Sequence, residues 1–321
     1  MLHFPPPLWC GRMLALAATL ALTVVVVSEA GARPRGKLVP DRGVYLGASV
    51  PGDQDGVRQF EEMVGRKLAI VSRYWGWRQR WPSDVELWAA RGGRIPMVSW
   101  SYRDAGKLRA IISGRWDRNI RRHARWVRRF GHRIFIRWAW EMNNNHAPWS
   151  GYANGRDPER YVRSWRRIVR IFRRVGARNA VFVWCPSRKS DPAEPWNAVR
   201  RYYPGHRYVD WVCTEAYNWG ETQDWSSWHD FAWLVGPNYR RFADRKPMMI
   251  GESGSVEQGG SKAAWILQTG NQMSNTFRNI AAYVWFNKPD QGADWRVNSS
   301  QTALQAFRDL GARTYFAPMR R

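Results

Sequence analysis

The sequence alternates between short apolar segments and longer segments of helical period, and this alternation constrains the fold more than any other feature. Helical segments fall between the apolar ones, which are rich in β-branched and aromatic residues. Eight candidate strands result: residues 44–50, 68–74, 95–100, 134–140, 180–184, 208–214, 247–251 and 280–286. Eight strand–helix alternations within about 280 residues predict a single (β/α)8 barrel, with parallel strands inside a ring of helices.

The segment that begins at Asp157 shows the helical pattern well. Asp157 is a good N-cap, Pro158 suits a first helical turn, and Gly176 is placed to end the helix. A buried stripe is predicted from residues at helical spacing: Tyr161, Trp165, Ile168, Val169, Phe172 and Val175. Arginines occupy the other face of this segment and of the preceding one, at residues 118–129. We therefore expect these arginines on the outer ring of helices.

The N-terminus has the pattern of a signal peptide over residues 1–32. Arg12 precedes an apolar run at residues 13–27, and residues 30–32 form an A-x-A cleavage site. The run is short for a membrane span, although an uncleaved membrane anchor is the alternative. Residues 33–42 are interpreted as a linker or an ordered lead-in, and residues 43–321 as one barrel domain. The expected location is extracellular.

The chain carries 51 Lys and Arg residues against 26 Asp and Glu, a net charge of +25. Such an excess predicts attraction to anionic surfaces, unless it is simply a solvated surface built with arginine. The export signal and the spread of arginine around the barrel argue against a nucleic-acid partner. Electrostatic attachment to an anionic cell-surface polymer remains open.

Two cysteines follow the predicted signal, Cys185 and Cys213. Each lies near the end of a predicted strand, and the two strands are consecutive. A secreted protein permits a disulfide between them. Two buried free thiols are equally compatible with the sequence.

Two glutamates stand at the ends of predicted strands on opposite sides of the barrel. Glu141 follows the fourth strand and Glu252 the seventh. Catalytic groups of such barrels come from these strand ends, although a structural salt bridge is the alternative for either residue alone. Together they can flank a glycosidic bond as acid/base and nucleophile. Nearby indoles would exclude water and raise the pKa of the acid: Trp138, Trp140, Trp149 and Trp285.

The order of several motifs resembles family 26 of the glycoside hydrolases, over about residues 44–307. The segment Arg-Trp-Ala-Trp-Glu-Met-Asn at residues 137–143 resembles the family's R-x-x-H-E-M-N. Other matching segments are residues 112–117, 179–184, 202–205, 208–211 and 284–287. The resemblance implies a retaining hydrolase of β-linked polysaccharide. It favours endo-β-mannanase activity, with mixed-linkage β-glucan and β-1,3-xylan as other substrates.

The resemblance also implies residue roles. Glu141 matches the acid/base, Glu252 the nucleophile, and Tyr217 a tyrosine that hydrogen-bonds the nucleophile. Trp285 matches the aromatic platform beneath the sugar, and Trp149 an aromatic residue in the loop after the acid/base. These two indoles are therefore expected to bind substrate.

Other motif positions include two departures from the family pattern. Trp140 stands where the family usually has a histidine that fixes the sugar, and Glu215 stands where many members have aspartate. Both are expected to contact substrate, as is Asn143. Arg137 is expected to support the carboxylates from inside the barrel.

The sequence gives little support to other chemistries. Its six histidines lack metal-ligand spacing, and no glycine-rich phosphate loop precedes a helix. We therefore expect no metal and no cofactor. We also expect the protein to be a monomer. The alternative function is a non-catalytic or weakened barrel that binds carbohydrate or an anionic cell-surface polymer.

Overall fold

The computed structural model describes residues 36–102 and 107–317, together with residues 1 and 3. The predicted signal peptide and its cleavage site lie outside the main described ranges. Residues 33–321 form one compact unit. Among the described residues, no helix combines the length and apolarity needed to cross a membrane.

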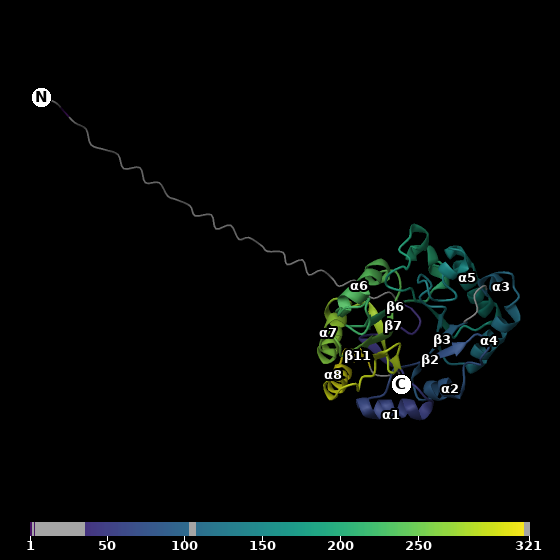
Figure 1. The fold of residues 1–321 in the computed structure, drawn as a ribbon, viewed down its shortest axis with the longest axis horizontal. Coiled ribbons are helices and arrows are strands. Elements are labelled where there is room, and N and C mark those ends of the chain that lie inside the picture. The colour runs from purple at the N-terminus through teal and green to yellow at the C-terminus, as the bar shows by residue number, and fades with distance from the viewer. Residues whose placement is uncertain (2, 4–35, 103–106, 318–321) are drawn as a thin grey trace. The chain divides into compact units, whose positions relative to one another are not determined.

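The eight predicted strands are present and close into a parallel barrel, which confirms the predicted fold (Figure 1). Each strand pairs in parallel with the next one in sequence, and β8 pairs back to β1. The strands are β1 (Val44–Ser49), β2 (Ile70–Gly76), β3 (Ile95–Ser101), β4 (Ile134–Trp138), β5 (Ala180–Trp184), β6 (Trp211–Asn218), β7 (Met248–Ser255) and β8 (Ile280–Phe286). A short β11 (Phe316–Ala317) also pairs in parallel with β1.

Within the described ranges, eight α-helices surround the strands and form the ring seen in Figure 1. They are α1 (Gln54–Val64), α2 (Asp84–Arg91), α3 (Lys107–Ile112), α4 (Asp117–Phe130), α5 (Pro158–Val175), α6 (Phe231–Phe242), α7 (Lys262–Asn275) and α8 (Gln301–Ala312). Four 3-10 turns occur in the loops after β4 and β5: η1 (Tyr152–Asn154), η2 (Pro195–Asn197), η3 (Val199–Tyr202) and η4 (His206–Tyr208). After β8 comes a small hairpin of β9 (Pro289–Asp290) and β10 (Ala293–Asp294).

Helix α5 has the predicted ends and the predicted buried face. The Asp157 side chain accepts a hydrogen bond from the Glu159 backbone at 3.0 Å, and Gly176 ends the helix with a φ of 81°. The stripe from Tyr161 to Phe172 is buried. On the other face, Arg167 binds Asp117 of α4 at 2.7 Å, so this arginine joins two helices.

Two residues of the segment that precedes β1 contact the barrel. Leu38 is 5% exposed and packs with the side chains that fill the barrel interior. The indole of Trp211 donates a hydrogen bond of 2.7 Å to the Lys37 carbonyl. These contacts attach residues 37 and 38 to the barrel, and the domain bounds expected from the sequence stay a prediction.

The two cysteines form a disulfide inside the barrel. Cys185 directly follows β5 and Cys213 lies on β6, so the bond joins neighbouring strands. A Cβ built on Gly251 would lie 2.3 Å from the Cys213 sulfur, so glycine is needed at this close approach. The bridge therefore lies directly beside the residue that precedes Glu252.

Strands β6 and β7 extend further than the sequence predicted. Their predicted ends were Thr214 and Gly251, whereas the ladder continues with Glu215 beside Glu252. Polar residues interrupt the apolar pattern there, although the backbone pairing continues. Both glutamates therefore lie on strands. The register of the β6–β7 pairing shifts between Thr214 and Glu215, where the apolar run of β6 is interrupted.

Candidate active site

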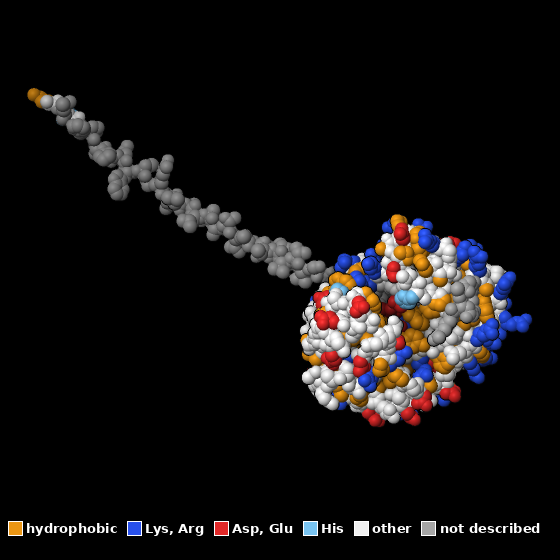
Figure 2. Space-filling view, in the orientation of Figure 1, with side chains coloured by type: hydrophobic (Ala, Val, Ile, Leu, Met, Phe, Trp, Pro, Cys, Tyr) orange, Lys and Arg blue, Asp and Glu red, His pale blue; other side chains and the backbone are white. Residues whose placement is uncertain are grey.

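Three carboxylates gather at the carboxyl ends of β4, β6 and β7, the end called the mouth below. Figure 2 shows a hollow near the centre of one face, with hydrophobic side chains in its wall. Glu141 lies three residues after the last residue of β4, and its backbone amide donates to the Cys185 carbonyl at 2.7 Å. Ala139 and Glu141 have φ values of 47° and 54°. This left-handed backbone is costly outside glycine and occurs often at functional sites.

Arg137 of β4 connects two of the carboxylates and is itself completely buried. One Nη atom donates to Glu252, and the other donates to Glu215 at 3.1 Å. Its Nε donates to the Ser99 hydroxyl at 3.0 Å. Burial alone would lower the pKa of Arg137, but the charges of Glu252 and Glu215 raise it above its usual value. The guanidinium therefore remains charged and supports the carboxylates from inside the barrel, as expected.

Glu252 of β7 accepts a second strong hydrogen bond from Tyr217 of β6. The phenol oxygen lies 2.6 Å from Oε2 of Glu252, whereas Arg137 binds Oε1. Burial raises the pKa of Tyr217, and the nearby charge of Glu252 adds to the effect, so the phenol stays protonated and donates. Both oxygens of this carboxylate are thus held in place by hydrogen-bond donors.

Glu215 of β6 is buried, with 9% of its surface exposed, and lies close enough to Glu141 and Glu252 to feel their charges. Burial raises the pKa of Glu215 well above its ordinary value, and the charges of Glu141 and Glu252 raise it further. Glu215 therefore keeps its proton at a pH where an isolated carboxyl group has lost it.

Two further side chains belong to the site although the sequence reasoning did not select them. Ser187, shortly after β5, donates from its hydroxyl to Glu141 at 3.1 Å. Tyr74 of β2 lies below Trp140, with ring centroids 5.6 Å apart, and beside the Arg137 guanidinium at 5.8 Å. Both lie at or shortly after strand ends, which was the signal that could have identified them.

Trp140 forms part of the wall of the mouth. Its ring is half-buried, lies 4.6 Å from the Arg137 guanidinium and contacts Trp149 at 5.2 Å. The Trp149 indole donates to the Trp140 carbonyl at 2.5 Å, and only 8% of Trp149 is exposed. Trp140 therefore presents a surface at the mouth, and Trp149 supports it from behind.

The structure contradicts the contact expected between Asn143 and substrate. Asn143 is completely buried. Its Oδ1 accepts from the Ser187 backbone at 2.8 Å, and its Nδ2 donates to the Ser190 hydroxyl at 3.2 Å. Asn143 consequently positions the loop after β5, including Ser187.

The platform role expected for Trp285 is also wrong in this structure. Trp285 is completely buried, packs against Trp265 and Phe307 of the outer helices, and donates to the Trp295 carbonyl at 2.7 Å. Successive strand residues face opposite sides of the sheet. The next residue, Phe286, is the one that faces inward, with ring centroids 5.8 Å from Tyr217.

A row of aromatic rings leads from Tyr217 to the surface, and the sequence reasoning did not anticipate it. Tyr217 contacts Trp295 at 4.9 Å, Trp295 contacts Trp219 at 4.7 Å, and Trp219 contacts Trp225 at 5.3 Å. Trp225 is 71% exposed. Exposed indole faces of this kind can stack on the C–H faces of sugars.

No group of three or more His, Cys, Asp or Glu side chains suited to a metal ion occurs among the described residues. The side chains that meet at the mouth offer carboxyl, hydroxyl and guanidinium groups. Paired carboxyl groups at the mouth of a (β/α)8 barrel are typical of glycoside hydrolases with this fold.

A family model described as glycosyl hydrolase family 26 matches residues 113–284, more than half of the chain. The chain belongs to this family.

Two curated relatives resemble the chain in sequence. It is 33% identical over 279 residues to Endoglucanase H of Acetivibrio thermocellus, a match that covers 84% of this chain and 31% of that protein. It is 26% identical over 214 residues to Beta-1,3-xylanase TXYA of a Vibrio species, covering 60% of this chain and 43% of that protein. The chain thus spans less than half the length of these relatives.

Solved structures share the fold at low sequence identity. The GH26 β-mannanase BoMan26A of Bacteroides ovatus superposes with a TM-score of 0.64 at 14% identity, covering 86% of this chain and 90% of that one. The modular endo-β-1,4-mannanase of Cellulomonas fimi gives a TM-score of 0.65 at 16% identity, covering 85% of this chain and 71% of that one. These likenesses support the barrel fold.

Proposed function

We propose that this chain is a secreted, retaining glycoside hydrolase that cleaves internal bonds of a β-glucan. The observation that carries the proposal is the arrangement of the three carboxyl groups. Glu252 accepts hydrogen bonds from Tyr217 and Arg137, and Glu141 accepts one from Ser187. Glu215 lies beside them with a raised pKa. A double displacement needs one carboxylate that attacks and one carboxylic acid that protonates.

In the first step Glu252 attacks the anomeric carbon while Glu141 protonates the leaving oxygen. In the second step Glu141 takes a proton from water, which attacks the glycosyl–enzyme ester and releases Glu252. Each substitution inverts the anomeric centre, so the product retains the original configuration. Ser187 orients the Glu141 carboxyl group by a hydrogen bond, and Glu215 lies near it with a raised pKa.

The choice of β-glucan rests on sequence similarity. The relative at 33% identity is named an endoglucanase, whereas the mannanase structures at 14% and 16% identity share the fold. β-Mannan, favoured by the family resemblance, becomes the second candidate, and β-1,3-xylan the third. Trp140 also supports a change of substrate, because an indole fills much more space than the family's histidine.

The proposal can be tested by the release of reducing ends from mixed-linkage β-glucan, β-mannan and β-1,3-xylan. The mature chain, residues 33–321, is compared with Glu252→Gln. We expect hydrolysis of β-glucan that is lost in the variant, and NMR of the first product should show the retained anomer. A folded wild type that binds these glycans and cleaves none would favour the carbohydrate-binding barrel instead.

Secretion is part of the same proposal and is tested separately. The full chain, fused to a reporter that is active only outside the cytoplasm, should be exported, and a chain without residues 1–32 should stay inside. Equal export of both forms would contradict the signal-peptide interpretation.

A further inference from the structure

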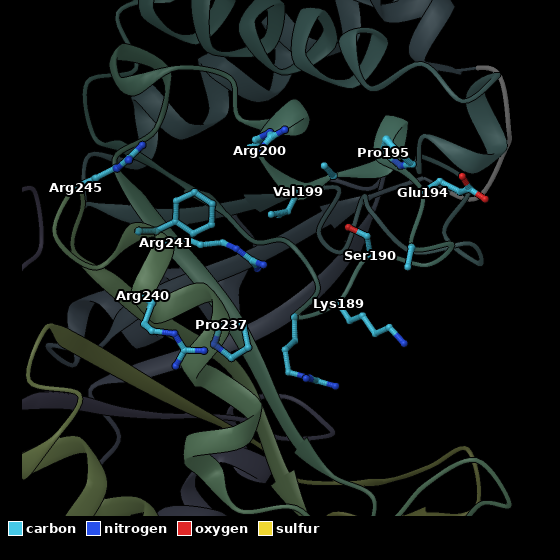
Figure 3. Close-up of a pocket in the computed structure, with 14 residues that line it drawn as sticks. Lys189, Ser190, Glu194, Pro195, Val199, Arg200, Pro237, Arg240, Arg241 and Arg245 are labelled. Carbon is cyan, nitrogen blue, oxygen red and sulfur yellow. The ribbon is translucent and has the colours of Figure 1, made fainter.

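A cavity of about 850 Å³ lies apart from the carboxylates, between the loop after β5 and helix α6. Figure 3 shows Lys189, Arg200, Arg240 and Arg241 around one open space. The six cations of its lining are Arg188, Lys189, Arg200, Arg240, Arg241 and Arg245. None of these six belongs to the catalytic site described above.

The charge of this cavity is strongly positive. Six of its lining residues are Lys or Arg, and Glu194 is the one acidic residue among them. Within the described part of the chain, one ion pair is recorded for these six cations, between Arg245 and Asp244 at 3.9 Å. Like charges around one cavity repel each other, and a bound anion would relieve this repulsion.

One cation of the cavity is held in place by stacking. The Arg188 guanidinium lies 3.5 Å from the centroid of Trp233, and the His229 ring stacks on the same indole at 3.4 Å. Burial lowers the pKa of Arg188 below its usual value, as expected for a guanidinium that is partly removed from water. An anion beside it would be bound by a preorganised donor.

The cavity and the catalytic acid/base share the loop after β5. Ser187 of this loop donates to Glu141, and Arg188 is the next residue. Asn238 of α6 donates to the Ser187 carbonyl of this loop at 3.4 Å and to the Thr214 hydroxyl of β6 at 3.0 Å, so it links the loop to β6. A glycan bound at the mouth therefore passes close to the basic cavity if it extends toward α6.

We propose that this cavity binds the anionic groups, carboxylate or sulfate, of an acidic polysaccharide. Guanidinium groups match both anions with paired N–H donors. The apolar side chains of Pro195, Val199 and Pro237 offer surface for the C–H groups of sugar rings. Phe242 is 5% exposed and offers no free face for stacking a base, which favours a glycan over a single-stranded nucleic acid. The choice of a glycan rests on the proposed function.

The test compares two variants that remove the same charge. The cavity variant is Lys189→Gln/Arg200→Gln/Arg240→Gln, and the control is Arg118→Gln/Arg125→Gln/Arg163→Gln on the exposed faces of α4 and α5. Calorimetry measures the binding of an oligogalacturonate, a sulfated oligosaccharide, a neutral cello-oligosaccharide and single-stranded DNA. Thermal unfolding checks that each variant is folded, and hydrolysis of neutral β-glucan is measured in parallel.

We expect the cavity variant to bind one acidic oligosaccharide about tenfold more weakly than wild type does, and the control variant to bind it within about twofold. Whether the oligogalacturonate or the sulfated oligosaccharide binds more tightly shows whether the cavity prefers carboxylate or sulfate. Equal weakening in both variants would mean diffuse attraction and overturn the proposal. The absence of any acidic-glycan binding would also overturn the proposal. DNA binding that weakens in the cavity variant as much as acidic-glycan binding does would overturn it too. Hydrolysis of neutral β-glucan should be unchanged in both variants. Activity that is kept while acidic-glycan binding is absent would overturn the cavity proposal alone, whereas absent activity in wild type would be a failure of the proposed enzyme.

Discussion

The phenol of Tyr217 donates a 2.6 Å hydrogen bond to Oε2 of Glu252, across the pairing of β6 with β7. The same ring packs on Trp295 at 4.9 Å and against Phe286 at 5.8 Å. The hydroxyl and the ring therefore have separable effects, one on the carboxylate and the other on the shape of the mouth.

Tyr217→Phe removes the hydroxyl and keeps the ring. We expect kcat/KM to fall about 10- to 100-fold, because the attacking carboxylate loses one of its two orienting donors. Thermal unfolding should change little, since the packing remains. Tyr239→Phe, a tyrosine on α6, provides a control away from the mouth. Unchanged kinetics would remove Tyr217 from the site.

Glu215→Gln tests the raised pKa of Glu215 through the pH dependence of kcat/KM. The amide cannot titrate, so the part of the profile that follows loss of the Glu215 proton should be missing from the variant. Glu194→Gln, on an exposed loop, is the control and should leave the profile unchanged. A Glu215→Gln profile identical to that of wild type would contradict a titration of Glu215 at the active site.

The same substitution has an expected effect on stability. The pKa of Glu215 is raised in the folded state, so between its unfolded and folded values the folded state binds more protons. Stability from this group therefore falls as pH rises above about 4.3. Melting curves from pH 4 to pH 8 should show a smaller decline for Glu215→Gln than for wild type. An equal or steeper decline would argue against the raised pKa.

Trp140→His introduces the residue that the family usually has at this position. The indole contacts Tyr74, Trp149 and the Arg137 guanidinium, so the smaller ring leaves space at the mouth. We expect kcat/KM on the preferred glycan to fall about tenfold or more, with a relative gain on another glycan of the panel. Trp126→His on α4 is the matched control. A specificity profile identical to wild type would exclude Trp140 as a determinant.

Cys185→Ala/Cys213→Ala tests the bond between β5 and β6. The bridge closes a segment with a sequence separation of 28, for which chain entropy predicts a loss of about 3 kcal/mol in the free energy of unfolding. Chemical denaturation of the oxidised wild type and the double variant measures this difference. A loss below about 1 kcal/mol would show that packing alone holds the two strands.

Lys262→Met tests how the loop after β8 is held. The completely buried Nζ donates to the carbonyls of Asp294 and Arg296 at 3.0 and 2.6 Å, and to the Ser299 hydroxyl at 2.9 Å. The variant leaves three acceptors without this donor, so we expect a loss of about 2–3 kcal/mol in stability. Because the loop carries Trp295, KM should rise as well. Chemical denaturation measures the loss of stability, and steady-state kinetics measures the rise in KM. A rise in KM without a loss of stability would show that the rise does not come from the lost hydrogen bonds of Lys262.

The pH dependence of Lys262 has the opposite sign to that of Glu215. Burial lowers its pKa to about 8, so above this pH the folded state binds fewer protons than the unfolded one. Wild type should therefore gain stability, relative to Lys262→Met, as pH rises from about 8 to about 10.4. A constant difference over this range would mean that the ammonium group titrates normally.

Much of the barrel followed from local patterns along the chain. The capping residues at Asp157 and Gly176 and the apolar stripe of α5 predicted that helix correctly. The strands were identified because buried parallel strands are continuous apolar runs. The ends of β6 and β7 were wrong for the same reason, since Glu215 and Glu252 lie within the ladder and interrupt the apolar run.

The candidate site was partly predictable. Glu141, Glu252 and Arg137 could be selected because they are charged residues at or near the ends of apolar strands. Trp285 was misplaced because one residue of register decides whether a side chain faces the barrel or the helices. Asn143 was misassigned because its partners, Ser187 and Ser190, lie more than 40 residues away.

The sequence by itself determined the eight strands, the helices between them and the placement of Glu141 and Glu252 near the carboxyl ends of β4 and β7. Tertiary structure alone decided which donors hold each carboxylate, that Cys185 bonds Cys213, and that Arg200 and Arg240 line one cavity. The physical reason is how far apart along the chain the interacting residues lie. Helix and strand patterns depend on neighbours a few residues apart, whereas the charges of the site act between side chains that only barrel closure brings together.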